Sequence, residues 1–309
     1  MQRNNRSAVT FISATSTFLK TGMIALFASL MLASCAKVDT IAPAATTTEE
    51  HSSAREDASL LNSDSFDNTK LANFWHKELW TPTAGVLSTE QQRVGSKSMR
   101  FSWKPAQYDG TNTTLHSELA SQSLINGETE RWYGYSTYLP SASMANDTEP
   151  VIISQWHGVP NDGVSHTVPP MAITLEAANK LTLVYRASSN PIVKVMQHPT
   201  SQKIIDLGTA SYDKWVDYVV HVKWDATGKT GVLQVWQDGV LKVNEQNISI
   251  GYPELQQPYW KVGLYAWTGK STHSERVAFC DEVRIGGATA NYDSVKPGRG
   301  NNSARIQAN

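Results

Sequence analysis

Apolar and polar residues alternate along most of the chain after residue 64, as they do in β-strands with one buried face. The clearest stretch, Trp215–Trp224, places apolar side chains on one face: Val216, Tyr218, Val220, Val222 and Trp224. Its other face carries Asp217, His221 and Lys223. No stretch of comparable strength repeats with the period of a helix, so the pattern predicts an all-β domain.

Turn signals separate a series of such strands. Asp225-Ala226-Thr227-Gly228 and the dipeptide Asp238-Gly239 each predict a hairpin connection. Further strands are expected at residues 98–103, 131–139, 151–156, 171–176, 181–186, 232–237, 240–245 and 277–285. Many short strands with turns between them predict an antiparallel β-sandwich of two sheets. We expect a jelly roll in which one sheet curves into a concave substrate groove.

The stretch Tyr259–Trp267 has a uniformly apolar face and an unusual second face. The apolar face, expected in the core, is formed by Trp260, Val262, Leu264 and Ala266. The other face is expected to be exposed and consists of Tyr259, Lys261, Gly263, Tyr265 and Trp267. A solvent-facing strand has no structural need for a cation, a phenol and further aromatic rings together. We therefore expect this face to bind a sugar acid and to transfer protons.

The N-terminus has the features of an export signal. Basic residues precede an apolar run at 22–33, which is short for a bilayer span. The sequence Leu32-Ala33-Ser34-Cys35 then resembles a bacterial lipobox, which implies cleavage before Cys35 and lipidation of its thiol. We expect residues 1–35 to be a lipoprotein signal peptide. The protein would be lipid-anchored in the bacterial cell envelope, at the outer membrane; an ordinary signal peptide and secretion are the alternative.

Composition predicts the remaining domain boundaries and limits the expected binding partners. Residues 36–63 are rich in Thr, Ala, Ser and Glu and are expected to be a flexible linker, followed by one domain at 64–292 and a polar tail at 293–309. A net charge of −1 over 309 residues provides no field to attract nucleic acid, and the lipid is the expected contact with a membrane. Cys280 has no disulfide partner in the mature chain, and its apolar neighbours predict burial.

Three short motifs carry the candidate chemistry, each on an expected strand. They are Leu115-His116-Ser117-Glu118-Leu119, Gln155-Trp156-His157-Gly158 and the stretch Tyr259–Trp267. In this order they resemble the jelly-roll polysaccharide lyases, which include alginate, glucuronan and heparin-type lyases. The pattern of that group is Arg/His-x-Glu, Gln-x-His and Tyr-x-Lys-x-Gly-x-Tyr. The resemblance covers most of the domain and implies cleavage of a uronate-containing polysaccharide by β-elimination.

Elimination needs groups that stabilise charge and groups that move protons. Removing the C5 proton builds charge onto the uronate carboxylate, and Gln155 and His116 are expected to donate hydrogen bonds to it. Tyr265 and His157 are the candidates for the base that removes the C5 proton and for the acid that protonates the bridging O4. One tyrosine suffices for D-glucuronate or D-mannuronate, in which both groups leave from one face. L-guluronate and L-iduronate require a histidine opposite the tyrosine, so both schemes stay open.

Other side chains are candidates for binding and support. Lys261 is expected at the substrate, where its charge would lower the pKa of Tyr265. Arg186 and Trp267 are further substrate-binding candidates, and Glu118 is expected to orient its neighbours. The histidines show no metal-ligand spacing such as His-Glu-x-x-His, so no cofactor is expected for the chemistry. Analogy with related sandwiches allows a structural calcium ion at Asp67 or Asp281.

The first motif departs from the alginate-lyase pattern and bears on the substrate. Alginate lyases resemble Arg-x-Glu-Leu-Arg there, whereas this chain has His116-Ser117-Glu118-Leu119-Ala120. The histidine form is more similar to glucuronan lyases, which favours a glucuronate-containing polymer such as glucuronan or ulvan. Alginate and heparin-type substrates are the alternatives, although a heavily sulfated polymer calls for a more basic domain.

Two other functions compete with the lyase interpretation. A glycoside hydrolase of this architecture needs paired carboxylates, typically as Glu-x-Asp-x-x-Glu, and the sequence lacks that spacing. A non-catalytic carbohydrate-binding lipoprotein would explain the aromatic residues and the tether. It gives no reason for Tyr265, His157 and Gln155 to occur together.

Overall fold

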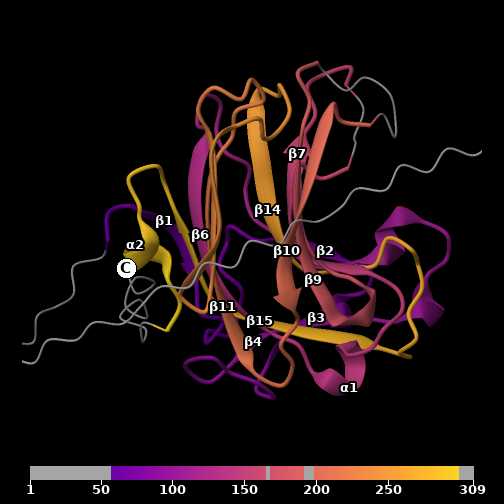
Figure 1. Cartoon of the computed structure of the whole chain (residues 1–309). Helices are drawn as coiled ribbons and strands as arrows, with labels where there is room; N and C mark the ends of the chain where they lie inside the picture. The colour runs from indigo at the N-terminus through magenta and orange to yellow at the C-terminus, as the bar shows by residue number, and fades with distance from the viewer. Residues whose placement is uncertain (1–56, 165–167, 191–197, 299–309) are drawn as a thin grey trace, which may run out of the picture. The chain divides into compact units, whose positions relative to one another are not determined.

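The computed structural model describes residues 57–164, 168–190 and 198–298, which form two antiparallel sheets packed face to face (Figure 1). The predicted signal peptide, the lipidation site Cys35 and the linker up to residue 56 lie outside the described residues, as does the tail after residue 298. Within the described part, no helix has the length and apolar character needed to span a bilayer.

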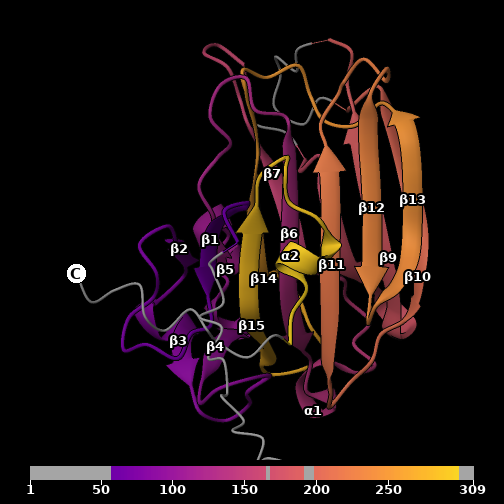
Figure 2. The same ribbon diagram turned by 90° about the vertical axis from the view of Figure 1, so that its left-hand side faces the viewer.

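One sheet has eight strands in the order β13-β12-β11-β6-β15-β4-β3, with β1 paired to β15. The strands are β1 (Leu60–Asp64), β3 (Gly85–Ser88), β4 (Ser98–Trp103), β6 (Glu130–Tyr138), β11 (Trp215–Lys223), β12 (Gly231–Gln237), β13 (Val240–Ile248) and β15 (Arg276–Gly286). The short helix α2 (Tyr292–Val295) lies across the outer face of this sheet, against β6 and β11 (Figure 2).

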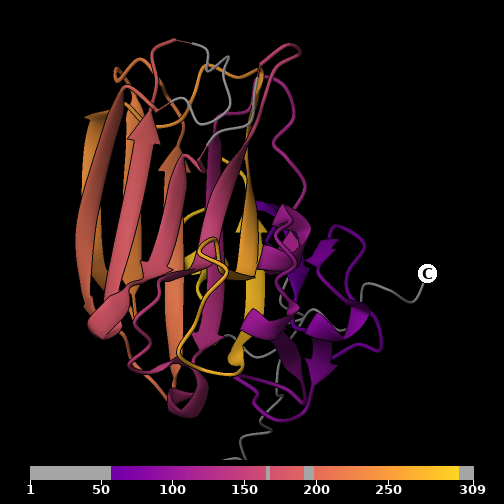
Figure 3. The same cartoon turned by 90° about the vertical axis from the view of Figure 1, so that its right-hand side faces the viewer.

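The other sheet has seven strands in the order β10-β9-β8-β7-β14-β5-β2 (Figure 3). They are β2 (His76–Leu79), β5 (His116–Ala120), β7 (Val151–Val159), β8 (Met171–Leu175), β9 (Lys180–Ala187), β10 (Ser201–Thr209) and β14 (Gln256–Tyr265). Short helical turns occupy the connections: η1 (Pro82–Ala84), η2 (Pro105–Gln107), η3 (Asn112–Leu115), α1 (Ser141–Met144) and η4 (Ala177–Asn179).

The core lies between the sheets and is rich in aromatic residues. Trp103, Trp156, Trp260, Tyr133 and Tyr135 are essentially inaccessible to solvent. The polar tips of two of these rings are satisfied, because Trp260 Nε1 donates to Ser154 Oγ at 2.8 Å and the Tyr135 hydroxyl donates to it at 3.1 Å. The predicted inward residues of 215–224 and 259–267 are all buried, and so is the free thiol of Cys280.

The all-β sandwich with two antiparallel sheets is confirmed, and the differences lie at its edges. The sequence pattern missed β1, β2, β3 and β10, which are short or lie at a sheet edge. Strand β1 begins at Leu60, within the segment expected to be linker, because it pairs with β15 far along the chain. Helix α2 extends past the expected boundary at residue 292 and buries Ser294 and Val295.

Candidate active site

The three motifs meet on the outer face of the seven-stranded sheet, because β5, β14 and β7 are neighbours in it. The register places Tyr265 opposite His116, and Lys261 opposite Gln155. Successive side chains of a strand point to opposite faces, so residues of equal parity share the face. The structure thus brings together four segments that are far apart in the sequence, including β2 at the sheet edge.

Two local irregularities make this arrangement possible. A bulge in β7 between Ile152 and Ser154 leaves Ser154 bonded to core residues and turns Gln155 to the outer face. In β14, Gly263 has φ +136, and an added Cβ would lie 2.2 Å from the carbonyl oxygen of Ser117. Only glycine lets β14 approach β5 this closely between Lys261 and Tyr265.

Glu118 is the centre of the polar cluster and is fully buried. His116 Nδ1 lies 2.7 Å from one carboxylate oxygen, and Gln155 Nε2 donates to the other at 2.7 Å. Burial alone would raise the pKa of Glu118. The hydrogen bond from His116 and the charge of Lys261 outweigh burial and hold that pKa below its ordinary value. The ionised carboxylate accepts from both neighbours and so fixes how they face.

His116 and Tyr265 form a parallel stack, with ring centroids 4.3 Å apart and planes 3° from parallel. His116 is buried, whereas Tyr265 is partly exposed. Above the stack, the carboxamide of Asn112 lies 3.2 Å from His116 Nε2, and its Oδ1 lies 3.4 Å from the Tyr265 hydroxyl. The imidazole therefore has polar partners at both nitrogens and an acidic phenol on its face.

Lys261 is a buried cation rather than the exposed residue expected from the alternation. It is 3% exposed, because its chain lies along the sheet face and its ammonium donates to Glu78 at 2.6 Å. Burial would lower the pKa of Lys261, but the charges of Glu118, Tyr259 and Glu78 raise it, so the ammonium stays charged. Direct contact of Lys261 with substrate stays a prediction.

Lys261 lowers the pKa of Tyr265, as expected, but the pKa is raised overall. Burial and the negative charge of Glu118 raise this pKa, and the opposing effect of Lys261 is smaller. The phenol is therefore protonated before substrate binds. It is ready to act as an acid, and its use as a base requires a change in its surroundings.

The candidate residues for metal ions have other partners. Ligand atoms of Glu78, His116 and Glu118 lie within 4.8 Å of one another, and the positive charge among them is the Lys261 ammonium. Asp67 Oδ1 accepts the backbone N–H groups of Ser96 and Lys97. Asp281 likewise accepts backbone N–H groups of Arg93, Val94 and Glu282. Calcium at Asp67 or Asp281 stays a prediction.

The other predicted site residues lie further from Tyr265. His157 Nδ1 lies 2.9 Å from the Gly158 carbonyl oxygen, and its ring packs on Tyr259 at 5.5 Å. In β14, Tyr259 is six residues from Tyr265, about 20 Å along an extended strand. The structure thus places His116, and not His157, against Tyr265.

Arg186 and Trp267 border the same face. Arg186 lies on β9, two strands beyond β7, and donates to Gln202 Oε1 at 2.7 Å and to the Pro169 carbonyl at 2.7 Å. Burial lowers its pKa. Trp267 follows β14, is 39% exposed, and has its ring centroid 6.4 Å from that of Tyr265. Substrate contact by either residue stays a prediction.

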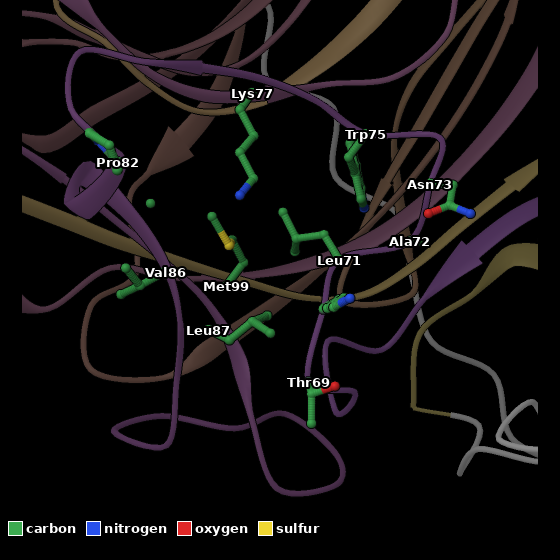
Figure 4. A pocket seen from close by; sticks show the side chains of 12 residues that line it. Thr69, Leu71, Ala72, Asn73, Trp75, Lys77, Pro82, Val86, Leu87 and Met99 are labelled. Atoms are coloured by element: carbon green, nitrogen blue, oxygen red, sulfur yellow. The ribbon is translucent and has the colours of Figure 1, made fainter. Parts of the chain in front are cut away.

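A separate pocket of about 600 Å³ opens beside β2, β3 and β4 (Figure 4). Lys77 points into it, whereas the neighbouring Glu78 faces the polar cluster on the other side of the same strand. Leu71, Trp75 and Met99 give the pocket an apolar lining, to which Lys70 and Lys77 add charge. The lining has no carboxylate, imidazole or phenol, so the acid–base groups gather on the sheet face and not here.

Sequence reasoning missed Asn112 and Glu78. Asn112 stands in the polar run Thr111-Asn112-Thr113-Thr114 directly before the first motif, and η3 folds it back over His116. Its position one short turn before a strand histidine is the signal that could have identified it. Glu78 lies in a four-residue strand whose pairing with β5 has no local signature.

Comparisons with known proteins show the family of this chain. The family model described as polysaccharide lyase matches residues 64–284, and the chain belongs to that family. The protein is therefore a polysaccharide lyase. A comparison with curated proteins gives no match.

The chain is similar to solved structures at low sequence identity, and the first of these shows the same fold. The endo-β-1,4-glucuronan lyase of the fungus Trichoderma reesei is 21% identical, with a TM-score of 0.56, over 72% of this chain and 97% of that chain. An alginate lyase of polysaccharide lyase family 7 is 14% identical, with a TM-score of 0.49, over 67% and 84% of the two chains. The marine alginate lyase of Aplysia kurodai is 11% identical, with a TM-score of 0.48, over 66% and 87%.

Proposed function

We propose that this lyase cleaves a uronate-containing polysaccharide by β-elimination and prefers a glucuronate-containing polymer such as glucuronan or ulvan. The observation that carries the proposal is the stack of Tyr265 on His116, held by Glu118 beside the Gln155 carboxamide. A phenol beside an ordered set of polar groups suits proton transfer next to a carboxylate. The similarity to a glucuronan lyase supports the proposal at the level of the fold.

In the proposed reaction, the phenolate of Tyr265 takes the C5 proton of the uronate. The C5 electron pair forms the C4=C5 double bond, the C4–O4 bond breaks, and O4 takes the proton back from Tyr265. Charge that builds on the uronate carboxylate is stabilised by an amide N–H donor, for which the Gln155 carboxamide on the same sheet face is the candidate. His116 supports Tyr265 and does not contact the sugar, since both of its nitrogens have protein partners.

The preference for glucuronate rests on the placement of the two histidines. In D-glucuronate, H5 and O4 leave from the same face, so one tyrosine performs both transfers. His157 packs on Tyr259 rather than on Tyr265, which supports the scheme with a single tyrosine. Alginate, whose L-guluronate units need groups on both faces, is the alternative substrate.

A substrate panel tests the proposal. The domain would be incubated with glucuronan, ulvan, alginate and heparin, and the conjugated C4=C5 uronate would be followed by ultraviolet absorbance. We expect the chromophore to form most rapidly with glucuronan or ulvan. New reducing ends without the chromophore would indicate hydrolysis, and binding without cleavage would indicate a carbohydrate-binding function; either would overturn the proposal.

We also propose that a lipid on Cys35 anchors the enzyme in the cell envelope, on the basis of the lipobox-like Leu32-Ala33-Ser34-Cys35. Replacing Cys35 with alanine should move the protein from the membrane fraction to the soluble fraction. Retention of Cys35→Ala in membranes would contradict this proposal and leave the catalytic one intact.

A further inference from the structure

A continuous chain of polar contacts joins Glu118 to Tyr265. His116 Nδ1 is 2.7 Å from Glu118 Oε2, and His116 Nε2 is 3.2 Å from Asn112 Nδ2. On its other side, Asn112 Oδ1 is 3.4 Å from the Tyr265 hydroxyl. Asn112 is exposed on η3, and its carboxamide bonds to both rings. These hydrogen bonds favour the orientation in which the amide nitrogen faces His116 and the oxygen faces Tyr265.

The donors and acceptors of this chain fix one another. The Glu118 carboxylate only accepts, so His116 donates from Nδ1. A neutral imidazole then has an acceptor at Nε2, which takes the N–H of Asn112. This leaves Asn112 Oδ1 facing Tyr265, and the phenol must donate to it. When His116 is neutral, this series of hydrogen bonds therefore favours the protonated form of Tyr265.

A second proton on His116 would reverse the two hydrogen bonds that Asn112 makes. Nε2 would become a donor, and Asn112 would have to turn its oxygen toward it. The amide nitrogen would then face Tyr265 and donate to the phenolic oxygen. A hydrogen bond donated to the charged form favours that form. The turned carboxamide therefore stabilises the phenolate that the elimination needs.

The charged groups around the ring stack are of both signs. Two carboxylates, Glu118 and Glu78, lie near one fixed cation, Lys261. Among the described residues, the phenol of Tyr108 also acts on Tyr265, whereas the phenol of Tyr259 acts on Lys261. Moving one proton from Tyr265 to His116 leaves the net charge of the site unchanged. In the second state, the imidazolium and Lys261 balance the two carboxylates, and the phenolate has a donor.

We propose that Asn112 is a positioning residue whose carboxamide couples the protonation of His116 to that of Tyr265. With the amide in one orientation, the site presents a phenol, the acid that protonates O4. With the amide turned, the site presents a phenolate, the base that takes H5. This inference rests on the proposed function, since it assigns both proton transfers to Tyr265.

The test is the pH dependence of unsaturated uronate formation by variants at residue 112. In Asn112→Asp, the carboxylate accepts from both neighbours but donates to neither, so the phenolate forms only at higher pH. We expect the ascending limb of kcat against pH to move up by about one unit or more. At neutral pH kcat should fall about tenfold or more, with KM within about twofold of wild type.

Further variants separate coupling from structure. Asn112→Ala should also lower kcat about tenfold, because the phenolate loses its donor. Thr113→Ala is the matched control on the same turn. The Thr113 hydroxyl bonds to the Thr111 hydroxyl, and the pH profile of this variant should match wild type. If Asn112→Asp merely lowers kcat equally at every pH, or if Asn112→Ala matches wild type, the proposal is overturned.

A second measurement needs no variant. Nitrogen-15 NMR of the wild-type enzyme reports which ring nitrogen of His116 carries the proton in the resting state. We expect the neutral tautomer protonated at Nδ1; a neutral ring protonated at Nε2 would overturn the inference. Absence of unsaturated product from every polymer in the wild type would instead remove the proposed function, so the two failures are distinguishable.

Discussion

Two histidines on opposite sheets have the same kinds of hydrogen-bond partner but stack on different aromatic rings. His116 lies on the outer face of the seven-stranded sheet, stacked on Tyr265 at 4.3 Å. His221 lies on the outer face of the eight-stranded sheet, stacked on Trp132 at 3.9 Å. Each ring bonds one carboxylate and one carboxamide, Glu118 and Asn112 for the first, and Glu130 and Gln234 for the second. Both rings are buried.

The difference shows that a well-bonded histidine does not by itself make an active site. His221 stacks on an indole, which has no proton to exchange at working pH. Its carboxylate partner Glu130 lies near the sheet surface, with 24% of its side chain exposed. His116 has a phenol on its face and a fully buried carboxylate behind it. The two sites thus differ in the ring stacked on the imidazole and in the burial of its carboxylate partner, and not in the hydrogen bonds of the imidazole.

The largest effect should come from removing the phenolic hydroxyl. Tyr265→Phe should lower kcat by about a thousandfold with little change in KM, since both proton transfers are lost. The fold should persist, because the ring and its stack on His116 remain. Trp132→Phe, the matched change on the other stack, should leave kcat near wild type. Initial rates of unsaturated uronate formation measure both, and full activity of Tyr265→Phe would contradict the assignment.

The two histidines themselves should separate activity from stability. His116→Ala should lower kcat about a hundredfold, because Tyr265 loses its stacking partner and its link to Glu118. His221→Ala should keep its activity but lose about 1–2 kcal/mol of stability, since Glu130 and Gln234 are left without their partner. Turnover and thermal unfolding of both variants check this. Equal loss of activity in the two would undo the comparison.

The buried and the exposed lysine pairs should differ in stability. Lys261→Met leaves Glu78 and the buried Glu118 without their cation and should cost about 3 kcal/mol. Lys203→Met breaks a pair with Glu245, in which half of the lysine side chain is exposed. That change should cost at most about 1 kcal/mol. Denaturant unfolding measures both; similar costs would mean that Lys261 is hydrated rather than buried.

The smallest effect concerns a second carboxylate, Glu254, near the end of β7. Unlike Glu118, it has one backbone donor, Val159 N at 3.0 Å, and burial raises its pKa to about 7. Between its ordinary value of 4.5 and about 7, the folded protein holds a proton that the unfolded chain has lost. Stability therefore falls as pH rises through this window, by on the order of 1 kcal/mol from this group.

Glu254→Gln removes that titration. Its melting temperature should change less between pH 5 and pH 8 than that of wild type, as measured by calorimetry at matched ionic strength. Glu118 contributes in the opposite sense, because its lowered pKa makes its stabilisation disappear on acidification. If wild type and Glu254→Gln lose stability in parallel, Glu254 is not the titrating group.

The sequence predicted what depends on local alternation and on short motifs. The apolar face of residues 259–267 and the meeting of His116, Gln155 and Tyr265 on one sheet face follow from period and motif. The parts it missed depend on long-range pairing. Strand β1 exists because β15 accepts it, and Glu78 reaches Lys261 because β2 adds to the sheet edge. No local pattern encodes either contact.

The balance of charges at the site could not be predicted from the sequence either. The spacing of Lys261 and Tyr265 correctly predicted a cation near the phenol. It did not predict that both groups are largely buried or that carboxylates compete with the cation. Lys261 lowers the pKa of Tyr265 as expected, but desolvation and Glu118 outweigh it, so the pKa is raised. Asn112 escaped notice because its role arises from how η3 folds over the stack.

The most direct test is a crystal structure of Tyr265→Phe with a bound glucuronate oligosaccharide. We predict a uronate ring over residue 265, with its C5 and O4 toward the missing hydroxyl and its carboxylate toward Gln155. An oligosaccharide bound instead in the pocket between Lys77 and Trp75, or over the His221 face of the other sheet, would contradict the account.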